Sequence, residues 1–241
     1  MTDIIQLVMN ASSLCYALGY LAGIAAFAWM ARRRNMLTNG MFALMGAGLL
    51  GGLLAANLAQ IATGEPGKTV LGSIAGGYLA VILYKRRLGI TRPTGDLFAV
   101  AICVGEAVGR FGCYFGGCCY GTESGLPWAV WQHGAFRHPS QLYLSASCLA
   151  ILGAMFLYDR TRPPENGLFF LQGALYCSAR FLIEYVREGP RAVGGLSAAQ
   201  WACLAGIIFF GTQLYRLVRK ARLGREPLVP TASADGLAIE V

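Results

Sequence analysis

The chain has 241 residues, of which 56% are hydrophobic and 13% are charged. Soluble domains carry about 25% charged residues, so this composition excludes an ordinary soluble protein and indicates an integral membrane protein. The formal net charge is +8. We interpret this excess as a topology signal rather than as a nucleic-acid-binding surface, because basic residues in a membrane protein gather on one side of the bilayer.

Apolar segments follow one another along the chain, and a span of about 20 such residues crosses a bilayer. We place seven of them at about residues 4–30, 36–61, 70–84, 97–112, 141–158, 168–186 and 198–217. The sequence therefore predicts an all-α fold, a polytopic integral membrane protein with seven transmembrane helices. We expect one membrane domain over residues 1–225 with a loop at about 113–139. Residues 226–241 lack periodicity and are predicted to be a disordered tail.

The basic residues sort to one side of these segments. If the amino terminus is outside, the inner connections carry fourteen of the twenty Lys and Arg residues and the outer side carries four. The positive-inside rule then predicts a periplasmic amino terminus and a cytoplasmic carboxyl terminus. The loop at 113–139 is expected on the periplasmic side of a bacterial inner membrane.

The end of the fourth segment carries two opposite charges. Glu106 and Arg110 are four residues apart and share one helix face, and charges at membrane depth are costly unless they have a partner or a function. Beyond Gly112 the sequence is rich in Gly and Cys, which is not typical of a regular helix. A buried arginine beside a glycine-rich, irregular backbone indicates a site for an anionic head group.

The sixth segment has a polar stripe. Tyr176, Arg180 and Glu184 recur every four residues on an otherwise apolar helix. One interpretation is that these charges, with Glu106 and Arg110, form ion pairs that hold helices together. The other is a cationic pocket for a phosphate, since the planar guanidinium binds phosphate oxygens bidentately.

His138 precedes the fifth segment and is one of two histidines. It is either a structural hydrogen-bonding group or a general base that takes a proton from a thiol or hydroxyl. We expect Pro139 in the first turn of the helix, where proline is tolerated. Ser140 and Gln141 are then expected to face the membrane interface.

Three cysteines cluster in the loop as Cys113-x4-Cys118-Cys119. In an oxidising periplasm they are expected to be structural, with a disulfide between Cys113 and one of the other two. A reactive thiol activated by the charge of Arg110 is a second possibility. The spacing favours a metal site less, because it lacks paired C-x2-C units. We expect neither a metal nor a cofactor.

These stretches together resemble the bacterial prolipoprotein diacylglyceryl transferase family over about residues 10–215. The matching motifs are Gly109-Arg110-Phe111-Gly112 followed by Gly121, His138-Pro139-Ser140-Gln141-Leu142-Tyr143, and Tyr176-x3-Arg180-Phe181-x2-Glu184-Tyr185-x-Arg187-Glu188. Weaker matches are Tyr16, Gly76-Gly77 and Asp96.

The resemblance implies transfer of the diacylglyceryl group of phosphatidylglycerol to the lipobox cysteine thiol of a prelipoprotein, with release of glycerol phosphate. It implies a monomer that acts on membrane lipid and not on nucleic acid. The catalytic residues it implies are Arg110, Arg180 and His138. The implied substrate-binding residues are Tyr16, Gly76, Gly77, Glu106, Gly109, Gly112, Gly121, Ser140, Gln141, Tyr143, Tyr176 and Glu184.

The chain departs from the family pattern at three positions. Ala75 stands where the family usually has a histidine, Cys113 where it has an asparagine, and Cys118 where it has an acidic residue. Two alternatives therefore stand beside diacylglyceryl transfer to a prelipoprotein. One is a related lipid-modifying transferase with a different acceptor, and the other is a non-catalytic phospholipid-binding membrane protein.

Overall fold

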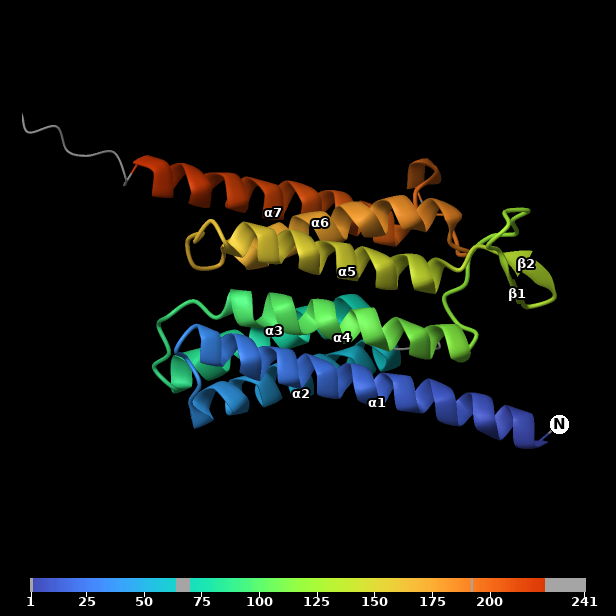
Figure 1. Cartoon of the computed structure of the whole chain (residues 1–241), viewed down its shortest axis with the longest axis horizontal. Helices are drawn as coiled ribbons and strands as arrows, with labels where there is room; N and C mark the ends of the chain where they lie inside the picture. Colours follow the sequence, from blue (N-terminus) through green and yellow to red (C-terminus); the bar gives the residue numbers. More distant parts are fainter. Residues whose placement is uncertain (1, 64–69, 192, 224–241) are drawn as a thin grey trace, which may run out of the picture.

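The computed structural model describes residues 2–63, 70–191 and 193–223 (Figure 1). The tail predicted over residues 226–241 lies outside the described residues. Within them, the long helices are α1 (Thr2–Arg33), α2 (Asn39–Thr63), α3 (Val70–Arg87), α4 (Gly95–Phe115), α5 (Ser140–Asp159), α6 (Gly167–Ile183) and α7 (Ala198–Leu223). The short elements are the strands β1 (Val130–Gln132) and β2 (Ala135–Arg137) and the 3-10 turns Glu184–Val186 and Val193–Gly195. The predicted all-α fold is confirmed.

Among the described residues, five helices are long and apolar enough to cross a membrane. They cover Asn10–Arg33, Gly40–Leu58, Gly95–Phe115, Ser140–Asp159 and Ala198–Leu223. Large apolar side chains such as Leu54, Leu149 and Ile208 are more than half exposed on these helices. An apolar surface of this extent is typical of contact with lipid. The prediction of seven spans is not tested, because α3 and α6 fall outside this set.

The helices pack in two groups that meet at α4 (Figure 1). α1 packs along α4, α2 along α3 and α6 along α7, while α4 also contacts α5 and α6. Glycine permits the close crossing of α1 and α4, since a Cβ at Gly19 would lie 2.9 Å from the carbonyl oxygen of Gly105. Small residues at helix contacts are the usual means of association in lipid. The packing places α4 at the centre of the molecule.

The two ends of α4 differ in their chemistry. At its start the Asp96 carboxylate accepts hydrogen bonds from the backbone N–H groups of Asn166 and Phe169. Nearby, Arg34 pairs with Asp159 at 2.6 Å. Asp96, a weak match to the family pattern, thus joins two helix ends far from the cysteine loop. The other end of α4 carries the candidate site.

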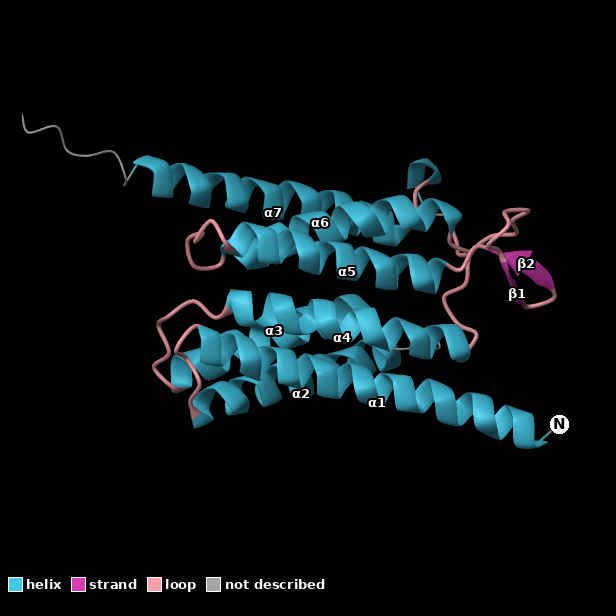
Figure 2. Cartoon of the chain, viewed as in Figure 1, coloured by secondary structure: helices cyan, strands magenta, loops and turns pink. Residues whose placement is uncertain are grey.

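The loop between α4 and α5 differs from the prediction in two ways. The helix does not break after Gly112 but continues to Phe115, so Cys113 lies in its last turn, and the chain turns at Gly117 with a φ of +63°. The loop also contains the hairpin of β1 and β2 (Figure 2). Its turn residues His133 and Gly134 both have positive φ, as a two-residue hairpin turn requires.

Candidate active site

Arg110 connects α4 to α6. Its Nη2 donates to Oε1 of Glu106 at 2.7 Å and to the hydroxyl of Tyr176 at 3.4 Å. The side chain of Arg110 is 17% exposed and that of Glu106 is 28% exposed. The ion pair predicted from the four-residue spacing therefore forms, and Tyr176 from the second predicted stripe joins it. This guanidinium is largely buried but still reachable.

Arg180 follows Tyr176 by one helical turn, so the stripe predicted on α6 is retained. Its Nη1 lies 2.8 Å from Oε2 of Glu184, which is buried. Glu184 also accepts a hydrogen bond from the hydroxyl of Ser197 at 3.1 Å and lies 3.7 Å from Nη1 of Arg187. Tyr176 provides the contact to Arg110, while Glu184 ties Arg180 to the start of α7.

The glycines after Glu106 bring Tyr16 of α1 onto α4. A Cβ at Gly112 would lie 3.0 Å from two ring atoms of Tyr16, and a Cβ at Gly19 would lie 3.0 Å from the backbone nitrogen of Gly109. The hydroxyl of Tyr16 donates to Sγ of Cys113 at 3.3 Å. Tyr16 therefore lies at the same end of α4 as Arg110, and Gly112 gives its ring room.

Gly121 lets the loop pass between the start of α5 and the end of α6. A Cβ there would lie 2.5 Å from both Cβ and the carbonyl oxygen of His138 and 2.6 Å from the carbonyl oxygen of Val186. The N–H of Gly121 donates to the His138 carbonyl at 3.0 Å, and the N–H of Thr122 donates to the Val186 carbonyl at 2.9 Å. The glycine is required by backbone contact on both sides.

Ser140 and Gln141 do not face the membrane interface as predicted. Both are fully buried, with 0% exposure. The Ser140 hydroxyl donates to the carbonyl of Cys119, and Nε2 of Gln141 donates to the carbonyl of Cys118 at 2.8 Å. Pro139 precedes the helix rather than occupying its first turn. These two side chains hold the cysteine loop against α5.

His138 forms its own cluster with aromatic residues. Its Nδ1 lies 3.2 Å from the hydroxyl of Tyr143, which accepts a hydrogen bond from Nε1 of Trp128 at 2.8 Å. In the described part of the chain, the hydrogen-bonded contact of this imidazole is thus with Tyr143 and not with either arginine. The structure places His138 at the loop side of the site.

Gly76 and Gly77 lie in the contact between α3 and α2. A Cβ at Gly76 would lie 2.5 Å from the carbonyl oxygen of Gly51, and one at Gly77 would lie 3.1 Å from that of Gly48. Their small size allows two helices to approach closely. The structure does not bring them to the group formed by Arg110, Glu106 and Tyr176, and helix packing explains them.

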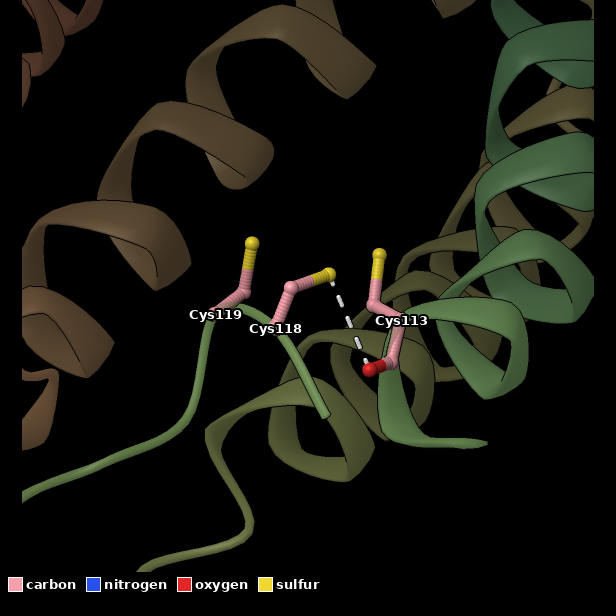
Figure 3. Close-up of side chains that lie close together, drawn as sticks. All are labelled: Cys113, Cys118 and Cys119. Carbon is pink, nitrogen blue, oxygen red and sulfur yellow. Dashed lines mark hydrogen bonds between the residues drawn. The ribbon is translucent and has the colours of Figure 1, made fainter. Parts of the chain in front are cut away.

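All eight cysteines lie within the described residues and are free thiols. The predicted disulfide is therefore not formed in this structure. The sulfur atoms of Cys113, Cys118 and Cys119 lie within 4.8 Å of one another, and Figure 3 shows the Cys118 sulfur between the other two. We call this group the three-thiol cluster.

The electrostatics of the cluster favour one thiolate. The pKa of Cys119 is lowered from its ordinary value by the neighbouring thiols of Cys113 and Cys118 and by the guanidinium of Arg187. Thiolates are the reactive and metal-binding form of cysteine.

The family described as "Prolipoprotein diacylglyceryl transferase" matches residues 1–216 of the chain. The chain belongs to this family. The five apolar helices agree with that assignment, and the chain is a multi-pass membrane protein.

Three relatives are each named phosphatidylglycerol--prolipoprotein diacylglyceryl transferase. The relative from Clostridium tetani is 28% identical over 215 residues, covering 80% of this chain and 86% of its own length. That from Nitratidesulfovibrio vulgaris is 30% identical over 249 residues, covering 88% and 91%. That from Gloeobacter violaceus is 33% identical over 178 residues, covering 68% and 65%.

Arg187 is a residue of this site that sequence reasoning missed. It stands near the end of the third matching motif but was not among the predicted site residues. The structure turns its side chain toward Cys119 and pairs it with Glu184. The spacing of three residues after Glu184 was the available signal, because residues three apart are neighbours on a helical turn.

Proposed function

We propose that this family member transfers the diacylglyceryl group of phosphatidylglycerol to the thiol of a prolipoprotein cysteine and releases glycerol phosphate. The observation that carries the proposal is the position of Arg110, held by Glu106 and Tyr176 and still 17% exposed. It lies at one end of an apolar bundle. A lipid head group reaches it there while the acyl chains stay along lipid-facing helices.

Arg110 is suited to hold the phosphate of the donor. Its contacts to Glu106 and Tyr176 both use Nη2, and a guanidinium has five N–H donors. Among the described residues, Nε and Nη1 thus keep donors for phosphate oxygens. As the carbon–oxygen bond of the donor breaks, negative charge grows on the departing phosphate, and a fixed cation stabilises it. We assign Arg180 the same electrostatic role from α6.

The acceptor thiol must lose its proton during the transfer. His138 is our candidate base, with Tyr143 orienting its ring through Nδ1. In this scheme the acceptor sulfur bonds to the terminal glycerol carbon, and the electron pair of the broken bond leaves with glycerol phosphate. Tyr16 then hydrogen-bonds the head group from α1.

We further propose that all seven helices span a bacterial inner membrane as one monomeric domain, with the amino terminus and the site on the periplasmic side. Basic residues end α1, α3 and α7, as Arg32 and Arg33, Lys85 to Arg87, and Lys220 with Arg222. In Figure 1 α1 and α7 end on the side away from the hairpin. The basic residues at these helix ends support a cytoplasmic location for the side of the bundle away from the hairpin.

The test uses purified full-length protein in vesicles of phosphatidylglycerol with a synthetic lipobox peptide. Mass spectrometry is expected to detect a peptide carrying one diacylglyceryl group and an equal amount of glycerol phosphate. A peptide with serine in place of cysteine, and vesicles of phosphatidylcholine, are the controls. Glycerol phosphate without modified peptide would point to another acceptor, and lipid binding without either product would favour the non-catalytic alternative.

A further inference from the structure

The three-thiol cluster has the dimensions of a metal site. The sulfur atoms of Cys113, Cys118 and Cys119 lie within 4.8 Å of one another. Two thiolates on one zinc ion are about 3.8 Å apart, because each Zn–S bond is about 2.3 Å and the angle is tetrahedral. Figure 3 shows the Cys113 and Cys119 sulfurs pointing to the same side with the Cys118 sulfur between them. Small side-chain rotations therefore bring all three onto one ion.

The backbone around the cluster is held in a specific and unfavourable conformation. Cys119 has a φ of +60°, a region that non-glycine residues rarely adopt and that persists where the surroundings fix it. The buried Ser140 and Gln141 fix it here by binding the carbonyls of Cys119 and Cys118. The N–H of Cys118 also donates to the carbonyl of Cys113 at 3.1 Å. These contacts hold the loop in the conformation that keeps the three sulfurs within 4.8 Å of one another.

The chemistry of the three cysteine ligands indicates which metal ion the cluster would bind. Thiolates favour soft or borderline cations such as zinc over magnesium or calcium. Zinc with three protein ligands keeps a fourth position for an exogenous group, and within the described residues the candidate group consists of these three cysteines. The cluster begins three residues after Arg110 on α4 and touches Tyr16. The cluster therefore begins on the same turn of α4 as the proposed phosphate site, and Cys113 interacts electrostatically with Arg110.

We propose that Cys113, Cys118 and Cys119 bind one Zn²⁺ ion, and that its fourth position takes the acceptor thiol of the transfer reaction. The second half of this inference rests on the proposed function. An acceptor thiol that binds zinc gives up its proton to His138, the candidate base, because a coordinated thiol is deprotonated. Its sulfur then forms the bond to the glycerol carbon, while the carbon–oxygen bond breaks and its electron pair leaves on the phosphate. No electron is gained or lost.

Metal binding is tested first, without reference to activity. Full-length protein purified under reducing conditions is loaded with Zn²⁺, or with Co²⁺ as a coloured probe, and freed of excess metal by gel filtration. We expect one zinc per chain and a sulfur-to-cobalt charge-transfer band. Cys113→Ala, Cys118→Ala and Cys119→Gly should each lose the band, glycine being chosen at 119 to keep the positive φ.

Cys15→Ala is the matched control, since Cys15 is next to Tyr16, which contacts Cys113, but is outside the cluster. It should keep full metal content. Thermal unfolding of each variant without metal checks that the fold is retained, and the exposed Cys118 is the position least able to perturb it. Wild-type zinc content no higher than that of the cluster variants, or a disulfide within the cluster of active protein, overturns the inference.

The role of the fourth position is tested with the cobalt-loaded protein. A lipobox peptide should change its charge-transfer band, and the serine peptide should not. If Cys118→Ala transfers lipid at the wild-type rate, the zinc inference fails and the proposed function stands. If the peptide thiol changes the cobalt spectrum but no lipid is transferred, the metal site stands and the proposed function fails.

Discussion

Arg110 of α4 and Tyr176 of α6 meet across the contact between their helices, with Nη2 of the guanidinium 3.4 Å from the tyrosine hydroxyl. Each residue belongs to a stripe with a spacing of four, Glu106 preceding Arg110 and Arg180 following Tyr176. This contact therefore joins two polar stripes from separate helices. It holds the guanidinium of Arg110 in a partly buried position, where solvent screens its charge weakly.

The first prediction concerns this arginine. Arg110→Ala should lower kcat for lipid transfer by about 10²–10³, the usual cost of removing one fixed donor from a developing negative charge. Arg110→Lys should restore little, because an ammonium cannot reproduce the bidentate guanidinium geometry. Initial rates with the lipobox peptide are the measurement, and the exposed Arg86 at the far end of α3, changed to Ala, is the control. Arg110→Ala turnover equal to that of the control would exclude a phosphate-binding role.

The second prediction concerns the Tyr176 hydroxyl, which positions the Arg110 guanidinium but carries no charge itself. Tyr176→Phe removes one hydroxyl and its contact with Arg110 but leaves both charges in place. We expect kcat/KM to fall by about threefold to tenfold, the equivalent of one hydrogen bond, with little change in the unfolding temperature. A loss as large as that of Arg110→Ala would mean that the hydroxyl itself contacts the reacting atoms.

The helices and the Glu106–Arg110 pair were predictable from local properties of the sequence. The length of each apolar segment fixes a helix, and the observed bounds differ from the predicted ones by a few residues. A spacing of four places two side chains on one face whatever surrounds them. These features depend on helix geometry alone, and so the sequence was sufficient for them.

The loop was less predictable because long-range contacts decide its structure. Cys113 stays helical since α1 packs beside it, with the Ser12 hydroxyl binding the carbonyl of Gly112 at 2.8 Å. Ser140 and Gln141 are buried because the cysteine loop folds back onto α5. Gly76 serves helix packing, a role that no residue near it in sequence reveals. None of these features could be predicted without knowing which segment of the chain packs against the residue concerned.

The third prediction tests the backbone contact at Gly121. Gly121→Ala places a methyl group 2.5 Å from the His138 carbonyl oxygen and 2.6 Å from that of Val186, so the loop must move. We expect a loss of about 1–3 kcal/mol in the free energy of unfolding. Gly125→Ala is the control, as a Cβ there meets nothing within 4 Å. Thermal unfolding in detergent measures both, and equal shifts would argue against the close approach at Gly121.

The fourth prediction concerns Glu184, which is buried with two arginines and a serine around it. Removing it leaves the guanidinium of Arg180, 15% exposed, without its carboxylate partner. Glu184→Ala should therefore lower the free energy of unfolding by about 3–5 kcal/mol, the cost of breaking a buried ion pair from one side.

Glu188→Ala is the matched control for Glu184→Ala. Glu188 is 52% exposed and pairs with Arg137 at 3.3 Å, and such exposed pairs contribute about 0–1 kcal/mol. Thermal unfolding of both variants in the same detergent should give a clearly larger shift for Glu184→Ala. Glu184→Gln should fall between the two, because the amide oxygen still accepts from Ser197 but carries no charge. If all three variants unfold together, Glu184 does not organise the end of α6, and Arg180 is held there by other contacts.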